Sequence, residues 1–595
     1  MVGDAERPQI PFTPEEEICG LFYSLIFKKG MNRMADQHFS ALSRKERLRN
    51  MTETHLDVLV IGGGITGAGI TLDATARGLN TACIEMQDFA AGTSSRSTKL
   101  VHGGLRYLEQ FEIKLVAEVG RERAIVYENA PHVTEPEWML LPIVKGGNLG
   151  KTTTSFGLQV YDRLAQVNKH ERRYMLNKKS TIEKEPLLRE DNLLGGGVYV
   201  EYRTDDARLT LEAMKKSVEL GANAVNYAKA TDLLYDNGKL IGVEVKDLIN
   251  NETHRIYADH VVNAAGPWVD TLRKVDGSNT GKHLHHTKGI HLVFDLSRFP
   301  LRQATYFDAP DGRMIFAIPR GNKAYVGTTD TDYGSNLQEP RVSREDRDYI
   351  LEVTNYEFPT LKLKAEDVES SWSGIRPLIQ EEGKSASEIS RKDEIFISDS
   401  GLISIAGGKL TGYRKMAERI VDVVVDKMNI HAPCPTQDIR LSGGEVGGSS
   451  GYETFAVKEA YRGEALGMTR DETEDLFRFY GANGLKMLEL LEENLEEAKN
   501  SGMPLKLAAR LLYALEYEMA VTPLDFLNRR TAFLFFDMPE LKRWKEPVTA
   551  FMKKSLNWSE EETKAYTKEL ESEIAYATKP YEDVEDQKAR EKQAN

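Results

Sequence analysis

The chain has 595 residues, which is enough for several domains with large buried cores. Its formal net charge of −14 argues against a nucleic-acid binder, because contact with phosphates needs a basic face. The three cysteines, Cys19, Cys83 and Cys434, lie far apart without CxxC spacing. They indicate a reducing compartment and offer neither a metal site nor a disulfide framework.

The N-terminal part precedes the first convincing strand, and we interpret residues 1–50 as an extension. Its most apolar run, "LFYSLIF" at residues 21–27, is too short to span a bilayer and follows acidic residues, whereas a signal peptide begins with basic ones. No other stretch predicts a membrane span, so we expect a cytoplasmic protein. Residues 28–50 contain seven Lys or Arg and two acids, which suits contact with anionic lipid. The favoured interpretation is a solvated helix opened by a Ser43/Glu46 capping box.

A dinucleotide signature follows in "LDVLVIGGGITGAGI". The apolar run at residues 56–61 predicts a parallel strand buried on both faces. In the GxGxxG that follows, Gly62 permits a tight turn, Gly64 lets the backbone approach a pyrophosphate, and Gly67 lets the next helix pack closely on the strand. A second strand ends at Glu85, where a carboxylate can accept hydrogen bonds from a ribose diol. The pattern suits FAD at least as well as NAD.

Two later glycine turns point to the same cofactor. "HVVNAAGPWVDTL" is an apolar strand that stops just before Gly266 and Trp268. "LISIAGGKLTGYRKMAERIVDVV" is a strand, a Gly407-Gly408 turn and a helix. A second helix N-terminus aimed at the site can stabilise negative charge on a reduced flavin. Each turn alone is an ordinary strand-to-helix connection, whereas the three together favour a flavin site.

Over residues 51–435, strand-like runs alternate with helical patterns, which predicts an α/β architecture. The later sequence is rich in Leu, Glu, Lys and Ala and predicts a separate all-helical domain at residues 436–580. Its two capping boxes are Thr469/Glu472 and Ser559/Glu562. Residues 581–595 are highly charged and lack apolar anchors, so we expect a disordered tail.

Specific motifs occur along this framework in the order "HGGLRYLE", "VNAAGPWVD", "SGIRPL", "GGKLTGYRKMAE" and "TPLDFLNRRTAFLFFD". With them the chain resembles, over about residues 40–570, the FAD-dependent glycerol-3-phosphate dehydrogenases of bacteria, of the aerobic type. The resemblance implies an FAD-binding Rossmann-like domain of the D-amino-acid oxidase and glutathione reductase type, with an α+β substrate subdomain. The implied FAD-binding parts are residues 55–150, 200–275 and 370–430, and the implied substrate-binding parts are residues 151–199 and 276–369.

That family oxidises sn-glycerol 3-phosphate to dihydroxyacetone phosphate by hydride transfer from C2 to flavin N5, and passes the electrons to membrane quinone. The reaction needs a base for the C2 hydroxyl and cations for the phosphate. By the resemblance, His102 is the base. Arg106 and Tyr107 suit phosphate oxygens. Gly103 and Gly104 allow close approach to the flavin ring.

The other motifs supply further site residues by the same resemblance. Arg376 matches the family's second substrate arginine, and Lys409 matches the lysine that sits near the flavin and the reacting centre. The resemblance therefore implies a catalytic role for both, besides His102. His291 is a rival base or substrate contact, which we rank below His102, and Thr411 lies at the flavin edge. The remaining implied cofactor positions are Ser94, Ser95, Lys99, Leu100, Gly266, Trp268, Gly408 and Leu410. No metal site is expected.

Several alternatives stay open. An oxidase would pass electrons to O2 and release H2O2, but the related soluble oxidases carry an extra insert that we do not find between Val326 and Arg376. An amine or amino-acid oxidase shares the fold, although Arg106 with Arg376 favours a phosphorylated substrate. A flavin-binding sensor or scaffold would be non-catalytic. Asp205 and Asp206 are interpreted as a helix N-terminus, and not as a catalytic pair. We expect a homodimer in peripheral contact with the inner face of the cytoplasmic membrane.

Overall fold

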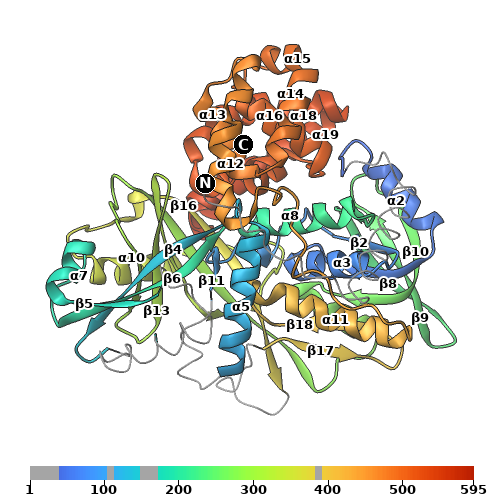
Figure 1. The fold of residues 1–595 in the computed structure, drawn as a ribbon, viewed down its shortest axis with the longest axis horizontal. Helices are drawn as coiled ribbons and strands as arrows, with labels where there is room; N and C mark the ends of the chain where they lie inside the picture. The colour runs from blue at the N-terminus through green and yellow to red at the C-terminus, as the bar shows by residue number, and fades with distance from the viewer. Residues whose placement is uncertain (1–38, 103–112, 148–157, 159–171, 382–391, 595) are drawn as a thin grey trace, which may run out of the picture.

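The computed structural model describes residues 39–102, 113–147, 158, 172–381 and 392–594. Two sheets lie next to each other, and a helical domain sits above the place where they meet (Figure 1). The fold is therefore α/β with an added all-helical domain, as the sequence predicts.

The first sheet has, within the described ranges, eight strands in the order β17-β18-β10-β1-β2-β7, with β9 and β8 continuing from β10. Strand β1 lies between β10 and β2 and pairs with both in parallel, which explains its continuous apolar sequence. The strands are β1 (Leu56–Ile61), β2 (Thr81–Ile84), β7 (Asn223–Val225), β8 (Ala228–Asp236), β9 (Lys239–Asp247), β10 (Thr253–Asn263), β17 (Glu394–Ile397) and β18 (Ile403–Ala406).

Three helices pack together on one face of this sheet. They are α3 (Ile65–Ala76), α8 (Asp206–Glu219) and α11 (Tyr413–Lys427). Their buried side chains share one apolar core with β1 and β18. Asp205 caps α8 by accepting a hydrogen bond from the Arg208 N–H, so the interpretation of this acidic pair as a helix N-terminus is confirmed.

Helix α2 (Arg44–Glu53) packs against the same sheet, so the predicted boundary at residue 50 falls inside a folded helix. Arg44 is 3% exposed and forms a buried ion pair with Asp247, and Arg47 is 1% exposed. The interpretation of a wholly solvated helix is therefore wrong, because two of its cations are internal. Ser43 precedes the helix as predicted, but its hydroxyl donates to the Ser40 carbonyl and caps nothing.

The second sheet has, over the described residues, ten strands in the order β15-β11-β14-β13-β12-β4-β6-β3, with β16 beside β11 and β5 beside β6. Strand β4 pairs antiparallel with β6 along its whole length, so it belongs to this sheet and not to the FAD-binding part assigned to residues 55–150. The strands are β3 (Leu100–Val101), β4 (Thr134–Val144), β5 (Tyr174–Asn177), β6 (Leu193–Thr204), β11 (Lys282–Asp295), β12 (Ala304–Asp308), β13 (Met314–Arg320), β14 (Lys323–Gly327), β15 (Thr331–Asp332) and β16 (Val368–Glu381).

Within the described ranges, four further helices accompany the two sheets: α5 (Ile113–Asn129), α7 (Lys178–Lys184), α9 (Val269–Val275) and α10 (Arg344–Glu357). The helical domain then runs from α12 to α20. Its helices are α12 (Gly448–Glu459), α13 (Arg470–Tyr480), α14 (Asn483–Glu493), α15 (Leu495–Asn500), α16 (Leu505–Tyr517), a π-helical turn at Asp525–Arg530, α17 (Phe533–Phe536), α18 (Met538–Leu556), α19 (Glu560–Thr578) and α20 (Tyr581–Ala594).

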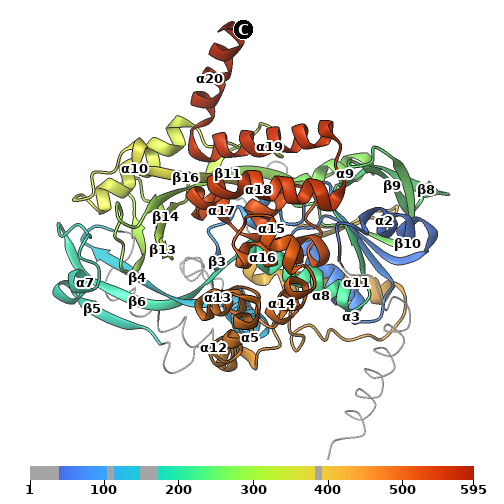
Figure 2. The same ribbon diagram turned by 90° about the horizontal axis from the view of Figure 1, so that it is seen from above.

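The two capping boxes predicted in the helical domain are confirmed, at the starts of α13 and α19. The prediction of a disordered tail is wrong over residues 581–594, which form α20 and project from the body of the molecule (Figure 2). The first two turns of α20 are held by ion pairs from Arg344 to Asp583 and Asp586. Across the described helices, none combines the length and apolar character that crossing a bilayer requires.

Candidate active site

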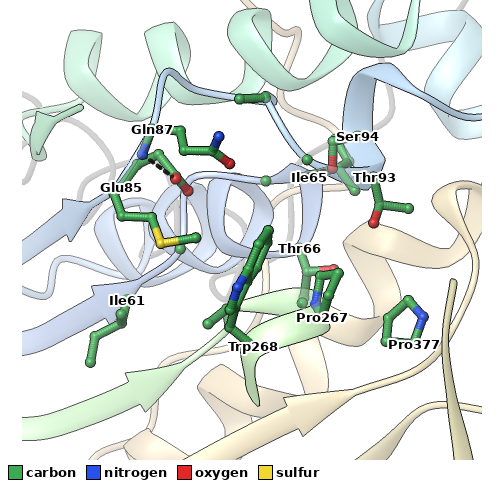
Figure 3. A pocket seen from close by; sticks show the side chains of 18 of the residues that line it. Ile61, Ile65, Thr66, Glu85, Gln87, Thr93, Ser94, Pro267, Trp268 and Pro377 are labelled. Carbon is green, nitrogen blue, oxygen red and sulfur yellow. Dashed lines mark hydrogen bonds between the residues drawn. The ribbon is translucent and has the colours of Figure 1, made fainter. Parts of the chain in front are cut away.

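A cavity of about 530 Å³ opens where β1, β2, β10 and β18 end. This is the edge of a parallel sheet at which nucleotide cofactors bind, and the volume is that of an ordinary ligand site. Figure 3 shows Glu85 and Gln87 near one end, Thr66 and Ser94 at the start of α3, and Trp268 between them.

The glycine turn forms the floor of this cavity. Gly62 has a φ of +115°, and a Cβ there would lie 2.5 Å from the Ala264 carbonyl oxygen at the end of β10. A Cβ on Gly67 would lie 1.8 Å from the Gly62 carbonyl oxygen. Gly62 and Gly64 line the cavity, whereas Gly67 lies behind the turn and permits the close approach of α3.

Glu85 follows β2 at the edge of the cavity. One carboxylate oxygen accepts a hydrogen bond from the Gly63 N–H at 2.6 Å, and the other accepts from the Gln87 N–H at 2.8 Å. Burial raises the pKa of Glu85, while these two donors act in the opposite direction. Each oxygen keeps a lone pair for a further donor, so the carboxylate suits a ribose diol.

Helix α3 directs its N-terminus at the cavity. Its first N–H, that of Ile65, donates to Ser94 Oγ at 2.9 Å, and Thr66 and Thr93 also line the wall (Figure 3). The positive end of the helix dipole and the hydroxyl groups beside it favour an anion such as a pyrophosphate. Ser94 therefore lies where the sequence places it.

The opposite wall comes from the two later glycine turns. Gly266 and Trp268 follow β10, and Gly408, Lys409 and Leu410 follow β18. Gly408 has a φ of +80°, and the single 3-10 turn after it leads directly into α11. A second helix N-terminus thus approaches the cavity, as the sequence predicts for the flavin end.

Thr411 joins this wall to His102. The Thr411 hydroxyl accepts a hydrogen bond from the His102 N–H at 2.9 Å and donates one to the His102 carbonyl at 3.1 Å. Thr411 itself is buried and does not line the cavity. His102 is half-buried at the end of β3, with its ring edge-on to Phe316. Burial, and then the charges of Lys409 and Arg123, hold the pKa of His102 well below its usual value, so the imidazole is neutral at physiological pH.

His291 lies deeper, in β11. It is 1% exposed and stacks on Trp372 with ring centres 4.7 Å apart, and its Nε2 is 3.1 Å from Thr98 Oγ1. Burial, and then the positive charges of Arg376 and Lys99, hold the pKa of His291 well below its usual value. A ring packed in this way has less access to a substrate than the half-buried ring of His102.

Arg376 extends from β16 beside these residues. Its guanidinium donates to the Thr329 carbonyl at 3.0 Å and to Thr328 Oγ1 at 2.9 Å, and pairs with Asp330 at 3.2 Å. A Cβ on Gly289 would lie 2.4 Å from one of its nitrogens, so the glycine makes room for the guanidinium. The group is partly exposed and oriented, which suits an arginine that contacts a phosphate.

Three predicted cofactor residues do not line the cavity. Lys99 donates to Asp206 at 2.6 Å and to the Ser95 carbonyl at 2.9 Å, so its ammonium supports the backbone. Leu100 is buried in β3, and the buried Ser95 hydroxyl lacks a protein partner within the described chain. Gly103, Gly104, Arg106 and Tyr107 lie outside the described residues.

The sequence reasoning missed a further wall of the cavity. Asn336, Leu337 and Gln338 line it near Met86, at the Glu85 end. These residues lie in an irregular stretch after β15 that carries no motif, so no pattern in the sequence connects them with the nucleotide signature. Only the three-dimensional fold brings them there.

The chain matches two known protein families. Residues 57–414 match the sequence model described as "FAD dependent oxidoreductase", and residues 434–563 match "C-terminal domain of alpha-glycerophosphate oxidase". The first match contains every described residue that we assign to the cavity walls, and the second covers the helical domain from α12 to the first turn of α19.

Relatives of similar length resemble the whole chain. The aerobic glycerol-3-phosphate dehydrogenase of Bacillus subtilis is 55% identical over 554 residues, which cover 92% of this chain and 100% of that protein. That of Staphylococcus aureus is 51% identical over 545 residues, 90% of this chain and 98% of that protein. The crystal structure of the glycerol-3-phosphate dehydrogenase from Bacillus halodurans in complex with FAD is 53% identical, with a TM-score of 0.81 over 91% of this chain and 99% of that one.

Proposed function

Because the chain belongs to the FAD-dependent oxidoreductases, and among them to the bacterial aerobic glycerol-3-phosphate dehydrogenases, we propose that it oxidises sn-glycerol 3-phosphate to dihydroxyacetone phosphate. The observation that carries the proposal is the pair of hydrogen bonds by which Thr411 fixes His102 to the turn that closes the cofactor cavity. A neutral imidazole is thereby held next to the flavin end of the site.

The residues of the cavity fit FAD. Glu85 would hold the adenosine ribose, the N-terminus of α3 with Ser94 would hold the pyrophosphate, and the turn at Gly408 and Lys409 would lie along the flavin. The glycine floor leaves the backbone bare where a pyrophosphate must approach closely. FAD, when bound, supplies the acceptor for a hydride from C2 of the substrate.

The protein's own groups would bind the substrate and move its proton. His102, kept neutral by its surroundings, would accept the proton of the C2 hydroxyl. Arg376, oriented by Thr328 and Thr329, would contact the phosphate, together with Arg106 and Tyr107 of the same motif as His102. Lys409 would add positive charge near the flavin end of the cavity.

We further propose a membrane quinone as the electron acceptor, peripheral contact with the inner face of the cytoplasmic membrane, and a homodimer. The support is the similarity to dehydrogenases and the absence of a bilayer-spanning helix from the described helices, which leaves a peripheral enzyme as the way to meet quinone. The competing acceptor is O2, because the helical domain also matches a domain named for an oxidase.

The test is anaerobic reduction of the purified yellow protein by sn-glycerol 3-phosphate, followed by reoxidation with a soluble quinone or with air. Bleaching with fast recovery only on quinone is the expected result. Equally fast recovery in air, with peroxide released, would identify an oxidase. A flavin that stays yellow with this substrate would contradict the proposed reaction and leave a flavin-binding sensor as the better interpretation.

A further inference from the structure

The helical domain contacts two segments of the chain that form part of the wall of the FAD cavity. Two segments that line the cavity at its Glu85 end each form an ion pair with this domain. We call residues 85–94 the Asp88 loop and residues 336–341 the Arg341 segment. They approach the same end of the cavity from the two different sheets, and neither contact takes part in the chemistry proposed above.

The Asp88 loop is held by two arginines of the π-helical turn. Arg529 Nε donates to Asp88 Oδ2 at 2.5 Å, and Arg530 donates to both carboxylate oxygens, to Oδ1 at 2.9 Å. All three side chains are at most 5% exposed. Burial alone would raise the pKa of Asp88, but the charges of Arg530 and Arg529 outweigh it and lower the pKa, so the carboxylate stays ionised.

This loop also supports the glycine floor. Two residues after Asp88, the Ala90 N–H donates to the Gly63 carbonyl at 3.0 Å. A Cβ on Gly63 would lie 2.5 Å from the Phe89 ring, so the loop is packed directly against the turn. Arg529 and Arg530 therefore act on the floor of the cavity through a single short loop.

The Arg341 segment is held by α19. Arg341 forms an ion pair with Glu573 at 2.6 Å, and its guanidinium lies 3.9 Å from the centre of the Tyr576 ring. The cavity-lining residues 336–338 end only three positions before Arg341. Figure 2 shows α19 lying along β16, which pairs with β11, and β11 in turn pairs with β15, from which this segment leaves.

We propose that the helical domain acts as a clamp on the cofactor, holding the Asp88 loop through Arg529 and Arg530 and the Arg341 segment through Glu573. FAD cannot leave at its adenosine end until one of these two segments moves. Moving the Arg341 segment breaks a partly buried ion pair, so the pair governs the rate of release. This inference rests on FAD in the cavity and does not depend on the substrate.

The experiment uses the full-length holoenzyme in its oxidised form. We expect Glu573→Gln, and separately Arg341→Gln, to raise the rate of FAD release after dilution about tenfold, as for the loss of one charge-assisted hydrogen bond. Release is followed by the increase in flavin fluorescence. The matched control is Glu571→Gln, because Glu571 lies on the same helix but pairs with Lys545 of α18, away from the cavity.

The clamp is supported if both Glu573→Gln and Arg341→Gln release FAD faster than the wild type while Glu571→Gln releases it at the wild-type rate. Wild-type release from both variants overturns it. Equal acceleration in all three also overturns it, because that result reflects general loosening of the helical domain. Bleaching by sn-glycerol 3-phosphate is measured separately, so failure of the proposed reaction leaves the release rates interpretable. Thermal unfolding of each holoenzyme confirms that the variants are folded.

Discussion

His102 is held through its main chain. The Thr411 hydroxyl bonds to both its N–H and its carbonyl, so the backbone of the residue is fixed, and no hydrogen bond joins its imidazole nitrogens to another residue in the described part of the chain. His291 is held differently, because its ring is stacked on Trp372 and its Nε2 contacts Thr98. A base that must accept a proton and then pass it on is better served by the first arrangement.

We expect His102→Ala to slow flavin reduction by sn-glycerol 3-phosphate by about 100-fold, the usual cost of losing a general base, while FAD stays bound. Anaerobic stopped-flow measurement of flavin bleaching gives the rate, and the flavin-to-protein absorbance ratio gives the FAD content. His291→Ala serves as the comparison. Unchanged reduction in His102→Ala together with slow reduction in His291→Ala would assign the base to His291.

The pH dependence of flavin reduction follows from the same environment. The pKa of His102 lies well below 6.5, so the imidazole is neutral above that pH and stays available as a base. At saturating substrate we expect the rate of reduction to be constant from pH 8 down through 6.5, and to fall only at lower pH as the ring becomes protonated. A decline that is half complete at or above pH 6.5 would show that another group limits the reaction.

At the scale of single elements, the site is built where strands end and helices begin. In the proposed arrangement the β1–α3 connection would hold the pyrophosphate and the β18–α11 connection would lie along the flavin, and each has a glycine turn before the helix. Both connections need glycine for a steric reason, and the structure identifies the atoms that a side chain would meet. The Gly62 carbonyl occupies the space that a Gly67 side chain would need.

We expect Gly67→Ala to lose most of its bound FAD and to lower the free energy of unfolding by about 1–3 kcal/mol, because the new methyl group overlaps a backbone oxygen that must then shift. The flavin absorbance of the purified protein and its thermal unfolding measure the two effects. Gly334→Ala is the matched control, since a Cβ at Gly334 has no heavy atom within 4 Å and its φ lies outside the left-handed region. Full FAD content in Gly67→Ala would contradict the role assigned to this turn.

At the scale of the whole molecule, local patterns predicted local structure well. The strand at Leu56–Ile61, the start of α8 and the capping boxes of α13 and α19 lie where the sequence places them, whereas the Ser43/Glu46 capping box does not form. The other failed predictions depend on distant partners. The pairing of β4 with β6, the ion pair of Arg44 with Asp247 and the contacts of α20 with Arg344 each need a second segment far away in the chain. The approach of residues 336–338 to the cavity has the same origin.

The order in which the strands occur has a consequence for synthesis of the protein. The chain passes from the first sheet to the second after β2, returns for β7 to β10, leaves again for β11 to β16, and comes back with β17 and β18. Strand β18 pairs with β10, and Gly408 and Lys409 directly after it complete the cavity wall. A growing polypeptide therefore cannot enclose the flavin before about residue 410 has left the ribosome. The nucleotide signature near the N-terminus is synthesised early, but the cavity that it lines is completed only when β18 has been made.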